Sequence, residues 1–108
     1  MTSETKERVT DLLTSLVSIE TENPPGNEQA AAEFICDWFR EEGIESTLLD
    51  EPNADRPQVA VRVSEVDPTV VLNGHIDVVP AGDSDQWSHP PTIQRLTATR
   101  STVAAARI

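Results

Sequence analysis

The sequence predicts an α/β fold in which two helices pack on a small mixed sheet. Three observations support this prediction. Apolar residues recur every three or four positions near the start, a second such segment follows a proline-rich interruption, and β-branched residues then alternate or run together. With 108 residues, the chain has room for one domain of ordinary size.

The first helix is expected over residues 3–20. Its apolar residues fall at i, i+3, i+4, i+7 and i+8, which places them on one face: Val9, Leu12, Leu13, Leu16 and Val17. Ser3 is the expected N-cap. Two prolines within residues 21–26 break the helical pattern, so this segment is expected to be a rigid loop.

The second helix is expected to begin after Asn27, with Glu28 in its first turn, and to stop at Gly43 in left-handed geometry. It should bury one side: Ala31, Phe34, Ile35, Trp38 and Phe39. Cys36 is expected to be a half-buried small residue, with no basic neighbour in sequence to activate its thiol.

Strands are expected at 45–49, 58–63 and 69–73. The second alternates valines with other residues, as a half-buried strand does. The third has the unbroken run Val70-Val71-Leu72, which is typical of a strand buried on both faces. Because the link 64–68 is too short for a parallel crossover, the second and third strands should be antiparallel or not adjacent, which predicts a mixed sheet.

Composition and charge narrow the function classes. Nineteen acidic residues against eight basic ones give a net charge of −11, which repels nucleic-acid phosphates and anionic lipid. No apolar run approaches the roughly 20 residues that span a bilayer, and the start of the chain lacks signal-peptide features, so a cytoplasmic location is expected. A single cysteine excludes an internal disulfide.

The expected third strand leads into His75 and Asp77. Ligands of α/β sheets gather beyond the carboxyl ends of strands. Two positions apart in an extended chain, both side chains point to the same side, so the carboxylate can orient the imidazole as it does for a metal-bound histidine. A hydrogen-bonded structural histidine is the alternative. His89, in a loop beside Pro90, is expected to be exposed.

The string NGHIDVVPAGD at 73–83, followed by Trp87 and Pro90-Pro91, resembles the segment around the first metal ligand in a family of zinc aminoacylases and carboxypeptidases. This family includes acetylornithine deacetylase and succinyl-diaminopimelate desuccinylase. The resemblance covers residues 9–91, because the family also places a helix, a loop like NPPGNE at 23–28 and a second helix before this strand.

The resemblance implies that residues 1–91 are the N-terminal segment of a zinc-peptidase-like α/β/α catalytic domain. The family holds two zinc ions, with cobalt as an alternative, and a glutamate activates a water that attacks the amide of an N-acyl amino acid or peptide. By this resemblance His75 is a metal ligand and Asp77 is the catalytic carboxylate that orients it. The remaining ligands and the general base have no counterpart here, so the chain alone is expected to be inactive.

Residues 92–108 are interpreted as a weakly structured out-of-frame tail. Residues 1–87 carry a net charge of −14, whereas 88–108 contain no acid and three bases. The family continues with a G-R-G-x-x-D-M segment, and a shifted frame over residues 102–108 can encode G-R-G-G-A-D-M, which the coding DNA would test. A homodimer is expected for the intact enzyme only. The alternative function is a small non-catalytic α/β module that binds a partner through an apolar sheet face.

Overall fold

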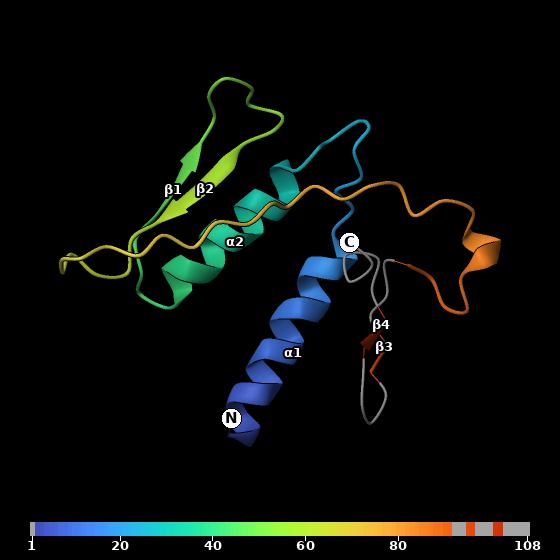
Figure 1. Cartoon of the computed structure of the whole chain (residues 1–108), viewed down its shortest axis with the longest axis horizontal. Helices are drawn as coiled ribbons and strands as arrows, with labels where there is room; N and C mark the ends of the chain where they lie inside the picture. The colour runs from blue at the N-terminus through green and yellow to red at the C-terminus, as the bar shows by residue number, and fades with distance from the viewer. Residues whose placement is uncertain (1, 92–94, 97–100, 103–108) are drawn as a thin grey trace.

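The computed structural model describes residues 2–91, 95–96 and 101–102 (Figure 1). The elements in chain order are α1 (Ser3–Ser18), α2 (Gln29–Glu41), β1 (Ser46–Leu49), β2 (Gln58–Val61), the 3-10 helix η1 (Ser84–Gln86), β3 (Arg95–Leu96) and β4 (Ser101–Thr102). β1 and β2 form an antiparallel pair in which Ser46 lies opposite Val61. β3 and β4 form a second antiparallel pair. The expected combination of two helices with short strands is therefore confirmed.

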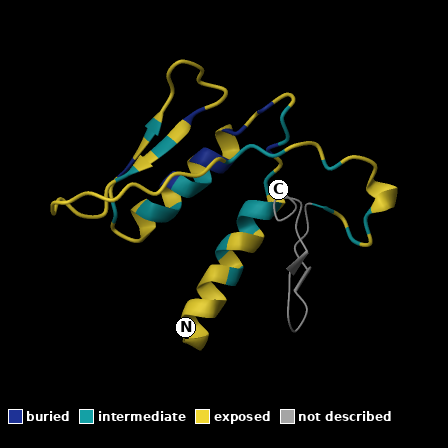
Figure 2. Ribbon diagram, viewed as in Figure 1, coloured by how far each residue is buried: buried dark blue, intermediate teal, exposed yellow. Residues whose placement is uncertain are grey.

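The core lies where α2 packs against the β1–β2 hairpin (Figure 2). Within the described ranges, the fully buried apolar residues are Ala31, Ala32 and Cys36, all on α2. The buried Ser46 hydroxyl donates to the Cys36 carbonyl at 2.8 Å, so the thiol is the donor in the 2.9 Å contact between Sγ and the Ser46 Oγ. Cys36 is thus more buried than expected, and its polar contacts tie the helix to the first strand.

The ends of the two helices follow their local sequence with one correction. Thr2, and not Ser3, is the N-cap of α1, because its hydroxyl oxygen accepts the Thr5 amide at 3.1 Å. Gly43 follows α2 with a φ of 77°, and its amide donates to the Arg40 carbonyl at 3.0 Å. The predicted left-handed stop is therefore confirmed.

α1 is less covered than its apolar pattern predicts. It contains no buried residue, and the Val9 and Leu13 side chains are exposed. α1 meets the end of α2 through Arg8, which forms an ion pair with Glu42 and lies over the Trp38 ring at 5.9 Å from its centroid. The prediction that helices pack on the sheet is thus confirmed for α2, while α1 reaches that unit through its polar face.

The strand predicted at 69–73 is wrong. Residues 62–77 form neither helix nor strand (Figure 1), and the valines at 70 and 71 are about 80% exposed. A strand of this composition needs a paired neighbour and layers on both faces, and no strand of the described residues pairs with 62–77. The mixed sheet is wrong for the same reason, since the sheet that does form here is an antiparallel hairpin.

Two further expectations concern the ends of the chain and membranes. The interpretation of 92–108 as an out-of-frame tail falls mostly outside the described residues, which include only 95–96 and 101–102 of it.

The zinc-peptidase-like α/β/α architecture stays a prediction. In the part of the chain that the structure describes, no helix combines the length and apolar character needed to cross a membrane.

Candidate functional site

The loop after α1 lies against residues 76–78. The Val78 amide donates to the Thr21 carbonyl at 3.0 Å, and the Asn23 amide donates to the Val78 carbonyl at 2.8 Å, which gives a parallel bridge between Glu22 and Val78. The Thr21 hydroxyl adds a 2.7 Å bond to the Ile76 carbonyl. We name the pairing of residues 21–23 with 76–78 the clasp. It holds the end of an otherwise exposed segment in extended form.

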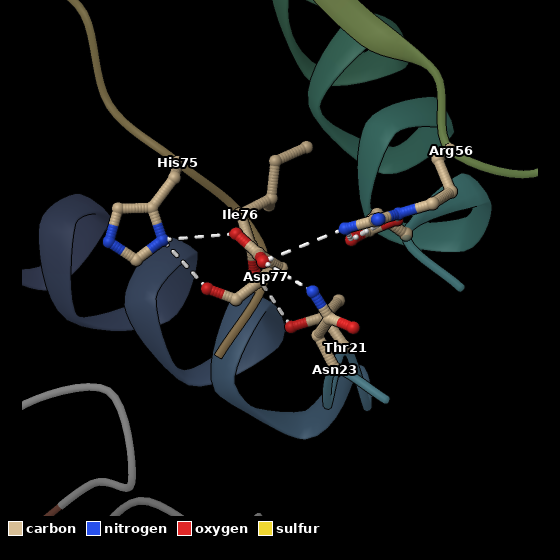
Figure 3. Close-up of polar contacts among 7 residues, drawn as sticks. Thr21, Asn23, Arg56, His75, Ile76 and Asp77 are labelled. Carbon is tan, nitrogen blue, oxygen red and sulfur yellow. Dashed lines mark hydrogen bonds and ion pairs between the residues drawn. The ribbon is translucent and has the colours of Figure 1, made fainter. Parts of the chain in front are cut away.

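Asp77 lies within the clasp, and His75 lies directly before it (Figure 3). Nδ1 of His75 is 2.7 Å from the Asp77 carbonyl oxygen and 3.3 Å from Oδ1 of the same residue. Both oxygens are acceptors when the carboxyl is ionised, so hydrogen-bond partners assign the imidazole proton to Nδ1. Nε2 points away from Asp77 (Figure 3), on a side chain that is 61% exposed. The neutral ring therefore presents the lone pair of Nε2 outward.

The other carboxylate oxygen of Asp77 has different partners. Oδ2 accepts a hydrogen bond from the Asn23 side-chain amide at 3.2 Å and lies 3.6 Å from Nη2 of Arg56. The hydrogen bond from Asn23 is the largest cause that lowers the pKa of the Asp77 carboxyl below its ordinary value, and the contacts with His75 and Arg56 act in the same direction. Asp77 is therefore held as an anion between an imidazole and a guanidinium.

Arg56 is itself held by Glu28. The Glu28 carboxylate, only 6% exposed, accepts Nη2 of Arg56 at 2.8 Å and Nε at 3.1 Å. The hydrogen bond with Glu28 is the main cause that raises the pKa of Arg56. Glu28 was expected in the first turn of the helix, but it is the N-cap residue of α2 and its side chain makes no capping bond. The Glu28 side chain instead accepts hydrogen bonds from the Arg56 guanidinium.

Sequence reasoning missed three of these residues: Asn23, Glu28 and Arg56. It interpreted the first as a residue of the proline-rich loop, the second as a charge in the first turn of the helix and the third as part of a turn-rich connector. The available signal was charge balance, because Arg56 is one of only five bases among the 19 acids of residues 1–87. A base in so acidic a context is well placed to pair with a carboxylate, although its partner could not be named from the sequence.

Two hollows border the pair. A small one of about 260 Å³ is lined by five residues of the clasp region: Asn23, His75, Asp77, Val78 and Val79. A larger open groove of about 1240 Å³ runs between the segment 62–77 and the face formed by α2 and β2. His75 and Asp77 line both hollows, so the imidazole stands where a ligand or further polypeptide could approach it from two sides.

His75 and Asp77 fit the roles of one metal ligand and the residue that orients it. An imidazole that donates Nδ1–H to a carbonyl oxygen, has a carboxylate oxygen 3.3 Å from the same nitrogen and offers Nε2 has the arrangement seen at metal-bound histidines. A zinc site needs three or four protein ligands, and no group of three His, Cys, Asp or Glu residues capable of holding a metal occurs in the described part of the chain. The residues described therefore fit part of a zinc centre and not a whole one.

Comparison with curated proteins finds relatives that share one name, succinyl-diaminopimelate desuccinylase. The chain is 33% identical over 91 residues to the probable succinyl-diaminopimelate desuccinylase of Staphylococcus aureus, covering 84% of this chain and 22% of that protein. The corresponding Staphylococcus epidermidis protein is 34% identical over 80 residues, covering 74% and 19%. The succinyl-diaminopimelate desuccinylase of Hydrogenovibrio crunogenus is 30% identical over 73 residues, covering 68% and 19%.

The chain thus spans about a fifth of the length of the curated relatives it matches. No family model matches the chain, and no solved structure matches it significantly.

Proposed function

Since the chain belongs, over most of its length, to the family of the succinyl-diaminopimelate desuccinylases, we propose that it carries part of the metal centre of a zinc-dependent amide hydrolase. The substrate class is an N-acyl amino acid or a related peptide, as the names of the relatives suggest for a succinyl amide. The chain by itself is proposed to be inactive, because it offers one zinc ligand where three or four are required.

The observation that carries this proposal is the state of the His75 ring. Two acceptors lie at Nδ1, and Nε2 is directed away from them on an exposed side chain. A structural histidine in a hydrogen-bonded core would instead engage both nitrogens with the protein interior. The ring is therefore prepared to give its second nitrogen to something outside the described residues.

The roles of the residues follow from their contacts. His75 is proposed to bind the ion through Nε2, and Asp77 to keep the proton on Nδ1 and to raise the basicity of the ring. The clasp fixes the backbone on both sides of Asp77, because Ile76 and Val78 are bonded to the loop after α1. Zinc, or cobalt in its place, would supply Lewis acidity to the reaction when two ions are bound.

A chimera tests the proposal. Residues 9–91 replace the aligned segment of the Staphylococcus aureus relative, and hydrolysis of N-succinyl-diaminopimelate is measured with and without zinc. The chimera should be active and the 108-residue chain should not. Asp77→Ala should lower zinc affinity or activity by about 10- to 100-fold, as loss of an orienting partner does, and His75→Ala should lower it further.

His89→Ala is the matched control, because it removes the other imidazole of the chain from outside the site. A chimera that keeps full activity and zinc content after His75→Ala would refute the proposed ligand role.

A second candidate function is a non-catalytic interaction module. Its support is the exposed apolar segment that includes Val66, Val70 and Leu72, each more than 70% exposed, which a partner protein would cover. The two functions predict different chimeras: a module that evolved for partner binding would not restore hydrolysis, while a segment of the enzyme would.

A further inference from the structure

Asp77 uses its two carboxylate oxygens for different neighbours. Oδ1 faces His75 at 3.3 Å, whereas Oδ2 faces Asn23 and Arg56 (Figure 3). A carboxylate free to rotate would spend part of the time in orientations that direct neither oxygen at the imidazole. Whatever holds Oδ2 in place therefore also decides how steadily Oδ1 meets His75.

Arg56 is anchored by Glu28 through Nε and Nη2, and Nη2 is also the nitrogen that faces Asp77. Its guanidinium shares two donors with the buried Glu28 carboxylate, a forked geometry that fixes the plane of the group. Gly26, with a φ of 73°, lets the loop backbone approach closely, since a Cβ at this position would lie 2.8 Å from the central guanidinium carbon. The guanidinium is thus confined between α2 and the loop.

We propose that Arg56 is a positioning residue, which Glu28 holds in place so that the charge on Nη2, 3.6 Å from Oδ2 of Asp77, keeps Oδ2 turned inward and Oδ1 directed at Nδ1 of His75. The relay runs from Glu28 through Arg56 and Asp77 to the imidazole. This inference rests on the proposed function, because its purpose is to prepare His75 to bind a metal. Neither Glu28 nor Arg56 forms a hydrogen bond or an ion pair with His75 itself.

A merely structural role for Arg56 would be to neutralise the buried Glu28 carboxylate. The two roles differ in what a lysine can replace. Lysine supplies the positive charge but not the planar fork, so Arg56→Lys should preserve the fold and still release Asp77. A role limited to neutralisation would leave His75 unchanged in that variant.

The main test measures the tautomer ratio of His75 by ¹⁵N NMR in the metal-free 108-residue chain at neutral pH. Arg56→Gln alone would leave the buried Glu28 carboxylate without its cation, so the double variant E28Q/R56Q is the principal probe. E28Q is a second probe, because it keeps the guanidinium but weakens its anchor. In both, the ratio of the Nδ1–H to the Nε2–H form should fall about threefold or more, the scale expected when one hydrogen bond is weakened. Backbone amide shifts of α2 report whether the fold is retained.

Arg62→Gln is the matched control. Arg62 directly follows β2 and lies outside the Glu28–Arg56–Asp77 relay, so this variant removes one positive charge without touching the relay. The inference is overturned if E28Q/R56Q and Arg56→Lys both keep the parent ratio with an intact α2, or if Arg62→Gln shifts the ratio equally.

Zinc binding by the chimera of residues 9–91 with the Staphylococcus aureus relative separates this inference from the proposed function, because the chain alone offers one zinc ligand where three or four are required. In the chimera, E28Q/R56Q should weaken zinc affinity about tenfold or more. If His75→Ala leaves the zinc affinity of the chimera unchanged, the ligand role fails while the tautomer measurement still decides whether the relay exists. If E28Q/R56Q leaves the zinc affinity unchanged while His75→Ala lowers it, the relay fails and the ligand role stands.

Discussion

The hairpin of β1 and β2, which packs on α2, and the segment 62–77 both contain valine and leucine but adopt different structures. The strands carry Leu48, Leu49, Val59 and Val61, and the segment carries Val63, Val66, Val70, Val71 and Leu72. In the first, helix and hairpin lie within about thirty residues of one another in sequence and bury Ala31, Ala32 and Cys36 between them. In the second, Leu72 is 94% exposed. The difference teaches that apolar character produces a strand only where a partner is at hand.

Hydrogen exchange should show the largest contrast between the two regions. Amides in the middle of α2 should exchange roughly a hundredfold or more slowly than those of 69–73, because the described residues offer the latter no backbone hydrogen bond. Mass spectrometry of peptic fragments measures both regions at once. Protection of 69–73 equal to that of β2 would mean that a third strand does form, and the comparison would break.

Packing substitutions should give the next largest difference. Ala32 is fully buried, so Ala32→Leu should lower the free energy of unfolding by about 1 to 3 kcal/mol through overpacking. Leu72→Ser, in the exposed segment, should change it by no more than about 0.5 kcal/mol. Urea denaturation followed by circular dichroism compares them. Equal losses would show that the exposed segment packs in solution.

The smallest effect is expected at the junction of the two regions, in the titration of Asp77. Its pKa in the folded chain is lowered, first by the Asn23 amide. The carboxylate therefore stabilises the fold at pH above its ordinary pKa, and this stabilisation is lost as the pH falls through the lowered pKa. Asn23→Ala should move the pKa of Asp77 upward towards its ordinary value, measured by the ¹³Cγ shift.

Asn27→Ala, at an exposed asparagine of the same loop, should leave that pKa where it is. If instead Asn23→Ala has no effect on Asp77, the amide contact does not persist in solution.

Sequence reasoning worked where structure depends on near neighbours. The helix stop at Gly43 and the two strands beginning near residues 45 and 58 were predictable, because turn chemistry and alternation are local. The proximity of His75 to Asp77 was also expected from their spacing. Their metal and catalytic roles stay predictions.

The rest depends on contacts between distant positions. The pairing of Glu28 with Arg56 joins residues 28 apart, and no local pattern encodes it. The run at 70–72 reports a preference for strand geometry but not the presence of a neighbour, so the predicted third strand was wrong. The predicted burial of α1 was wrong for the same reason. Its apolar face was predictable from the sequence, but the absence, among the described residues, of a surface to cover that face was not.

The clasp has a consequence for the order in which the chain folds. It joins Thr21 to Ile76 across 55 residues, and closing so long a loop costs more entropy than forming the hairpin inside it. The helix and hairpin should therefore assemble early, and the ends of the loop should meet afterwards. Asp77 acquires its contacts with Asn23 and Arg56 only in that last step, so a chain caught during synthesis or partial unfolding would keep its secondary structure while the carboxylate beside His75 lacks these partners.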